Sequence, residues 1–150
     1  MHSGAKFRAL LIVMLFLTAT NVMSDPLGLP AIPEELTGSP AMRQLGKKLF
    51  FDRGLSMNGT LSCAMCHIPD QGFTSNQSAL SVGMEGRSLR RNAPSLYNIA
   101  FKHYLFLDGR ETDLAAQVWG PLLAPDEMGN PAIGQVLSRL RNNSDYSRAF

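Results

Sequence analysis

Two cysteines and a histidine lie within five residues of one another, at Cys63, Cys66 and His67, and they are the side chains of this chain best suited to chemistry. Thiols three residues apart lie about one helical turn apart, so each can form a thioether with a vinyl group on one edge of a porphyrin. The adjacent histidine then lies under the iron as its proximal ligand. This Cys-x-x-Cys-His spacing predicts covalent attachment of one c-type haem.

Three other uses of a Cys-x-x-Cys pair fit the sequence less well. A thioredoxin-like redox pair requires a βαβ context, and no strand-rich pattern flanks this pair. A zinc site requires four ligands, and the chain contains no second cysteine pair. A structural disulfide is sterically unfavourable across two residues of a helix. Covalent haem is therefore the favoured interpretation.

The first 24 residues have the pattern of a secretory signal peptide. The positive charges of Lys6 and Arg8 precede an apolar stretch over residues 9–19, and small residues then predict cleavage before Asp25. The apolar stretch is too short to span a bilayer, although an uncleaved N-terminal anchor is the alternative interpretation. Because haem is normally attached to this motif outside the cytoplasmic membrane, both patterns together predict a periplasmic protein.

The formal net charge of +2 comes from Lys6 and Arg8, and the rest of the chain carries as many basic as acidic residues. A neutral mature chain gives no basis for binding nucleic acid. Residues 25–150 have the length of one domain. A chain of this size buries a modest core, to which a haem would add a large apolar surface.

The order of elements favours an all-α protein, because no internal repeat and no strand pattern is present. Prolines predict an extended arm over residues 25–40. Ser39 and Pro40 have the residue types of an N-cap and a first helical turn. Apolar spacing and turn residues predict four helices: from residue 40 to 51, a short buried helix over 94–101, a helix over 113–119 capped by Thr112 and ended by Gly120-Pro121, and a helix over 133–140.

Residues 68–94 read as one long loop, rich in glycine and serine and without a lasting period. A loop of this length in a compact domain is usually functional, and here we expect it to wrap a haem edge. The predicted class is thus an all-α, cytochrome c-like haem domain with long haem-wrapping loops. Arg87, Arg90 and Arg91 lie at the end of the loop, either as solvated surface charges or as partners of the haem propionates.

Several further segments follow one another in a characteristic order. They are Leu45–Asp52, Leu55-Ser56, Asn58–Thr60, Gly72–Thr74, Arg91–Leu96, Asp108–Arg110, Gln117, Gly120–Leu122 and Glu127-Met128. With the haem motif among them, residues 41–150 resemble the N-terminal haem domain of bacterial di-haem cytochrome c peroxidases and their MauG-type relatives. The resemblance implies a peroxidatic haem, where hydrogen peroxide is reduced to water with electrons from a c-type cytochrome or a similar donor protein.

The resemblance also implies roles for three residues. Glu127 matches the acid/base glutamate of the family, Gln117 matches a glutamine of the same distal pocket, and Asn92 matches an asparagine that helps hold calcium between two haem domains. The chemistry agrees for Glu127, because cleavage of a peroxide bond requires a group that takes a proton and returns it. Without the resemblance, these residues would be interpreted as a surface acid, an exposed helix residue and a helix cap.

Three positions depart from the family pattern. Met84 stands where many of these peroxidases have a histidine that binds the iron in the resting state; it is either a weak distal ligand or a packing residue, and we favour an open or water-bound sixth position. His103 is expected to be a partly exposed helix-end residue. Leu107 replaces a tryptophan that lies between two haems, and Trp119 cannot be assumed to substitute for it.

A single haem motif leaves the organisation of the functional protein open. We expect residues 41–150 to belong to a longer protein with a second haem domain, or to act with a separate partner or as a homodimer. A MauG-type oxidase acting on a protein partner is one alternative. The other is a mono-haem electron-transfer cytochrome, in which Met128 would bind the iron as sixth ligand and make it unreactive to peroxide.

Overall fold

The computed structural model describes residues 28–150, and residues Ile32–Phe150 form one compact unit. The predicted signal peptide and the start of the predicted arm lie outside the described residues. Across residues 28–150 there are helices and no strand, and β-type pairing is limited to three isolated bridges. This confirms the helical class. No helix in the described part of the chain combines the length and apolarity needed to cross a bilayer.

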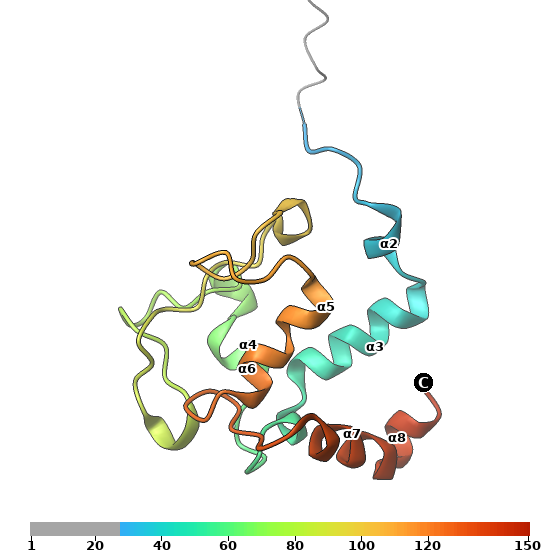
Figure 1. Cartoon of the computed structure of the whole chain (residues 1–150), viewed down its shortest axis with the longest axis vertical. Coiled ribbons are helices and arrows are strands. Elements are labelled where there is room, and N and C mark those ends of the chain that lie inside the picture. The colour runs from blue at the N-terminus through green and yellow to red at the C-terminus, as the bar shows by residue number, and fades with distance from the viewer. Residues whose placement is uncertain (1–27) are drawn as a thin grey trace, which may run out of the picture. The chain divides into compact units, whose positions relative to one another are not determined.

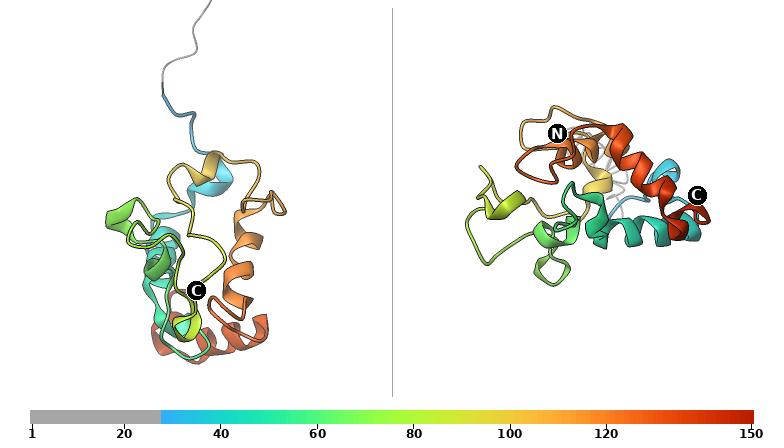
Figure 2. Two further views of the ribbon diagram at one scale, coloured as in Figure 1. Left: turned by 90° about the vertical axis from the view of Figure 1, so that its left-hand side faces the viewer. Right: turned by 90° about the horizontal axis from the view of Figure 1, so that it is seen from below.

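Most of the helices are short. The α-helices are α2 (Glu34–Thr37), α3 (Pro40–Phe51), α4 (Cys63–Cys66), α5 (Leu114–Gln117), α6 (Trp119–Leu123), α7 (Ile133–Asn142) and α8 (Ser144–Ser147). The 3₁₀ turns are η1 (Arg53–Leu55), η2 (Pro69–Gln71), η3 (Met84–Gly86) and η4 (Ile99–Phe101). In the compact unit, α3 and α4 lie on one side and α5 and α6 on the other, while α7 and α8 run across one end (Figure 1, Figure 2).

The longest helix begins as its sequence predicts. The Ser39 hydroxyl accepts a hydrogen bond from the Met42 amide at 3.1 Å, and Pro40 occupies the first turn, where no amide hydrogen is required. Part of the predicted extended arm differs, because α2 forms one helical turn there. Two glutamates in its first turn suit the positive end of the helix dipole.

The helix predicted over residues 113–119 differs in both its start and its end. Asp113, not Thr112, caps α5, because its carboxylate accepts hydrogen bonds from the Ala115 and Ala116 amides at 2.6 and 3.2 Å. The expected stop at Gly120-Pro121 is also wrong, since both residues lie inside α6. Pro121 is tolerated in the first turn of α6 because amides there have no intrahelical acceptor.

The short buried helix predicted over residues 94–101 is also wrong. Only the 3₁₀ turn η4 forms, and its residues are half-buried. Asn98 precedes it in the left-handed conformation, with φ of 59°, which interrupts any continuous right-handed helix at this position.

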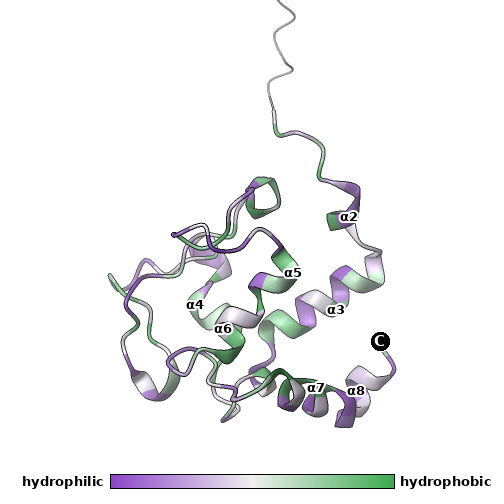
Figure 3. Ribbon diagram, viewed as in Figure 1, coloured by the Kyte–Doolittle hydropathy of each residue, from purple (hydrophilic) through white to green (hydrophobic). Residues whose placement is uncertain are grey.

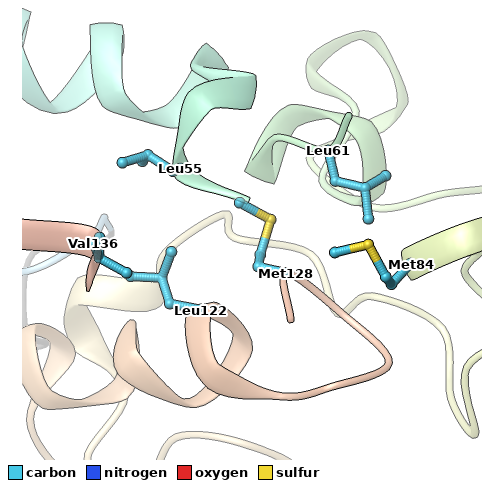
Figure 4. Packing of buried hydrophobic residues seen from close by; sticks show 6 residues of the cluster. All are labelled: Leu55, Leu61, Met84, Leu122, Met128 and Val136. Carbon is cyan, nitrogen blue, oxygen red and sulfur yellow. The ribbon is translucent and has the colours of Figure 1, made fainter. Parts of the chain in front are cut away.

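The core joins the two sides of the unit near α7. Met128 lies in the middle of the cluster, with Met84 and Leu61 on one side and Leu55, Leu122 and Val136 on the other (Figure 4). Leu49, Trp119 and Leu140 pack against these residues. Hydrophobic and hydrophilic residues both occur along α7, which is expected of a helix with one face on this core (Figure 3).

Tyr146 connects α8 to the end of α3. Its side chain is buried, its hydroxyl donates a hydrogen bond to Asp52 Oδ2 at 2.6 Å, and the Lys48 ammonium lies 4.5 Å from the centre of its ring. Burial, and then the hydrogen bond to Asp52, raise the pKa of Tyr146 above its ordinary value of 10.0. The folded chain therefore keeps the phenol protonated at pH values where the unfolded chain has lost that proton.

We expect Tyr146→Phe to lower the free energy of unfolding by about 2 kcal/mol at pH 7, because a hydrogen bond to a charged group is lost. The wild type should lose further stability as the pH rises above about 10, since there the unfolded chain releases a proton that the folded chain retains. The Phe variant lacks this decline. Urea denaturation at pH 7, 9 and 10.5 measures both effects, and parallel pH profiles of the two proteins would contradict this account.

Candidate haem site

The two cysteines begin and end α4, a single helical turn. Both are free thiols and half-buried, and the His67 amide donates a hydrogen bond to the Cys63 carbonyl at 2.9 Å. Ser62 occupies the N-cap position without a side-chain hydrogen bond. The helical turn therefore places the thiols one turn apart, with the histidine directly after them, which is the spacing that attachment to one porphyrin edge requires.

The imidazole of His67 is oriented by two backbone carbonyls. Its Nδ1 lies 3.0 Å from the Phe73 oxygen and 3.1 Å from the Pro94 oxygen. Carbonyl oxygens only accept hydrogen bonds, so Nδ1 carries the proton and Nε2 keeps its lone pair for a metal. Histidine ligands of metals are usually fixed in this way, by a hydrogen bond from the nitrogen that does not bind.

This donor set fits a c-type haem. Two thiols can form the thioethers, and one oriented imidazole can bind the iron. Within residues 28–150, no group of three or more His, Cys, Asp and Glu side chains is arranged to hold a metal ion directly.

The candidate acid/base residues come from the side opposite α4. Gln117 ends α5, and Glu127 lies in the turn that follows α6, with its amide donating to the Ala124 carbonyl at 3.0 Å. Both side chains are half-buried. Burial, and after it the Glu127 carboxylate, raise the pKa of the Cys66 thiol. Segment 82–84 joins the two turns: the Val82 carbonyl oxygen lies 3.7 Å from Cys66 Sγ, and the Met84 amide donates to the Asp126 carbonyl at 2.9 Å, so the fold brings the turn that bears Glu127 toward the attachment site.

Arg110 belongs to the Asp108–Arg110 segment, but the sequence gave no indication that it influences Glu127. Burial, and then the adjacent Asp126, raise the pKa of Glu127, whereas Arg110 lowers it. The Arg110 guanidinium lies 2.8 Å from both oxygens of Asp108 and 3.4 Å from the centre of the Phe106 ring. The Asp-Gly-Arg spacing could have predicted the ion pair between Arg110 and Asp108, but not the electrostatic effect of Arg110 on Glu127.

The comparisons with known proteins identify the family. The sequence profile described as "Di-haem cytochrome c peroxidase" matches residues 40–150. The chain belongs to this family. The resemblance seen in the sequence is thereby confirmed, and membership implies a c-type haem as cofactor.

Individual relatives agree with this assignment. Methylamine utilization protein MauG from Paracoccus denitrificans is 38% identical over 128 residues, covering 73% of this chain and 33% of that protein. Cytochrome c551 peroxidase from Pseudomonas aeruginosa is 42% identical over 103 residues, covering 65% of this chain and 30% of that protein. The crystal structure of a MauG-like protein associated with microbial copper homeostasis gives a TM-score of 0.70 at 33% identity, covering 88% of this chain and 39% of that one. The chain thus spans about a third of the length of these family members.

The segment 68–94, predicted to wrap the haem, passes close to the attachment turn. Cys66 Sγ lies 3.7 Å from the Val82 carbonyl oxygen. A groove of roughly 470 Å³ lies here, lined by Met65 and Cys66 and by residues between 75 and 86. Arg87, Arg90 and Arg91 are all exposed, and Arg87 pairs with Glu85 at 2.7 Å. Their pairing with haem propionates stays a prediction.

Asn92 is engaged within the same segment. Its Oδ1 accepts hydrogen bonds from the Ser81 hydroxyl and the Ala93 amide, both at 2.9 Å, and its Nδ2 donates to the Ser75 carbonyl at 2.5 Å. These bonds connect the two ends of residues 75–93. The predicted contact of Asn92 with calcium would use the same Oδ1 and stays a prediction.

The remaining candidates lie in different surroundings. Met84 and Met128 are both buried in the core cluster, so their packing is clear while their roles as iron ligands stay predictions. His103 is exposed. Leu107 is 81% exposed, and Trp119 packs against the core instead. Trp119 therefore lies against the core and not at the exposed position that Leu107 occupies.

Proposed function

We propose that residues 41–150 form a peroxidatic haem domain that reduces hydrogen peroxide to water with electrons from a c-type cytochrome or a similar donor. The observation that carries this proposal is the half-buried Glu127, whose turn is hydrogen-bonded to the segment that contacts the attachment cysteine Cys66. The family, with relatives named as cytochrome c peroxidases, supports it.

Three residues of the chain would have separate roles in the reduction of peroxide. His67 would bind the iron through Nε2, with Nδ1 held by the Phe73 and Pro94 carbonyls. When bound, the haem supplies the electrons that break the peroxide O–O bond. Glu127 would take a proton from one peroxide oxygen and return it to the other, so that the second oxygen leaves as one water; two electrons from the donor and two protons from solvent would then convert the first oxygen to a second water. The Gln117 amide, at the end of α5, can donate a hydrogen bond that orients the peroxide.

Several features of the whole protein belong to the same proposal. We place it in the periplasm, exported by a cleavable signal peptide. A second haem domain, or a homodimer, would deliver electrons, and calcium at Asn92 would stabilise the contact between haem domains. We propose an open or water-bound sixth position on the iron, with Met84 as a packing residue.

A second candidate activity is oxidation of a protein partner. The 38% identity to methylamine utilization protein MauG favours this MauG-type alternative. It uses the same His67 and Glu127, so the two activities differ in what supplies the electrons rather than in the chemistry of this domain.

An absorption and EPR spectrum of the ferric, haem-loaded chain tests the proposal, recorded before and after addition of hydrogen peroxide. A high-spin iron whose spectrum changes with peroxide is the expected result. A low-spin iron that is indifferent to peroxide would overturn it and favour the electron-transfer cytochrome. Met84→Ala and Met128→Ala then show which thioether binds, because removal of the ligand abolishes the low-spin signal.

A further inference from the structure

A buried amide lies three residues after Glu127. Asn130 is 1% exposed, and its Nδ2 donates hydrogen bonds to the Leu55 and Leu122 carbonyls, both at 2.8 Å. Its Oδ1 accepts a hydrogen bond from the Arg139 guanidinium. Every donor and acceptor atom of this side chain is therefore used, which fixes its rotamer.

Arg139 extends these contacts to α7. Its Nη2 donates to Asn130, and its Nη1 donates to the Ser56 carbonyl at 2.5 Å. The side chain is half-buried, and its hydrogen bonds go to neutral oxygens. One guanidinium thus connects α7, the segment after α3 and the residue at which the Glu127 turn ends.

The turn over residues 124–130 is fixed along its backbone as well. The Met57 amide donates to the Met128 carbonyl and the Met84 amide donates to the Asp126 carbonyl, both at 2.9 Å. Within residues 28–150, by contrast, the Glu127 carboxylate makes no hydrogen bond to another side chain or to the backbone. Its orientation therefore depends on the position of its own backbone.

We propose that Asn130 and Arg139 are positioning residues for the peroxide step: they fix the turn over residues 124–130 so that the Glu127 carboxylate is aimed at the peroxide. The inference rests on the proposed function. It assigns no contact with peroxide to either residue. Both act through Glu127, and a shift of the turn by about 1 Å is enough to slow proton transfer by up to 10²-fold.

The test compares Arg139→Gln with Arg141→Gln, which changes an exposed arginine on the same helix. Stopped-flow absorption of the haem-loaded chain gives the limiting rate and the half-saturating peroxide concentration. For Arg139→Gln we expect the limiting rate to fall about 10- to 100-fold with little change in half-saturation. Hydrogen exchange should become faster at the amides of residues 126–130. Arg141→Gln should match the wild type in both measurements.

Two further variants separate positioning from general destabilisation. Arg139→Lys keeps the charge but reaches one oxygen rather than two, so it should restore part of the rate, and circular dichroism establishes that it folds. In a Glu127→Gln background, Arg139→Gln should slow the reaction no further, because residues that act through one group are not additive.

The outcomes distinguish this inference from the proposed function. A wild type that does not react with peroxide overturns the proposed function, and the inference that rests on it. A reactive wild type with an equally reactive, folded Arg139→Gln variant overturns the positioning role alone. Equal slowing in the wild-type and Glu127→Gln backgrounds also overturns it, because Arg139 would then act independently of Glu127.

Discussion

Glu127→Gln is expected to slow the reaction of the haem-loaded chain with hydrogen peroxide by about 10²- to 10⁴-fold, the range that a positioned acid/base group contributes. Glutamine has nearly the same shape but cannot accept and return a proton. The haem attachment and the resting spectrum should stay unchanged, since Glu127 is neither an attachment residue nor the proximal ligand. Stopped-flow absorption over a range of peroxide concentrations measures the effect.

The surroundings of Glu127 explain why this acid, among twelve acidic residues, is singled out. Burial raises its pKa, and a carboxylate with a raised pKa is a stronger base, so it takes a proton from the peroxide more readily than an ordinary surface acid would. Glu85→Gln is the matched control, because Glu85 lines the groove beside Cys66 but is exposed and paired with Arg87. A Glu127→Gln variant that reacts as fast as Glu85→Gln would exclude Glu127 as the acid/base group.

The features that could be predicted from the sequence are local ones, whose structure is determined by residues close to one another in the chain. The start of α3 depends on Ser39 and Pro40, and the attachment turn depends on the spacing between Cys63 and Cys66. In each case the residues that determine the structure lie within one turn of one another. The two errors near α5 and α6 are also local. The adjacent residues Thr112 and Asp113 can both serve as an N-cap, and Asp113 caps α5. Gly120-Pro121 was expected to end a helix, but a proline is tolerated in a first turn, and here both residues lie in α6.

The support of the site could not be predicted in this way. Asn130 donates a hydrogen bond to the Leu55 carbonyl and Arg139 donates one to the Ser56 carbonyl, and the partners lie 75 and 83 residues apart in the sequence. Nothing in the residues around Asn130 marks it as buried, because asparagine after a glycine usually indicates an exposed turn. Such contacts depend on which segments the whole fold brings together, and a spacing pattern carries no information about them.

Gly83→Ala should lower the free energy of unfolding by about 3 kcal/mol, close to the upper end of what overpacking costs. A Cβ atom at this position would lie 1.9 Å from the Asp126 carbonyl oxygen and 2.9 Å from a methyl group of Leu89. The φ of Gly83 is −107°, which is not in the left-handed region, so we argue the requirement for glycine from space. Because the obstacle is backbone, segment 83–84 and the turn that carries Glu127 must move apart.

Gly46→Ala is the informative control, since it should change stability in the opposite direction. Gly46 lies in the middle of α3, and a Cβ there meets nothing within 4 Å. Alanine is a better helix former than glycine, so this variant should gain about 1 kcal/mol. Urea denaturation of the haem-loaded proteins compares the two. If Gly83→Ala is as stable as Gly46→Ala, the close approach of residue 83 to Asp126 is wrong. If it is destabilised but folded, it should also react more slowly with peroxide, because the displaced backbone bears Glu127.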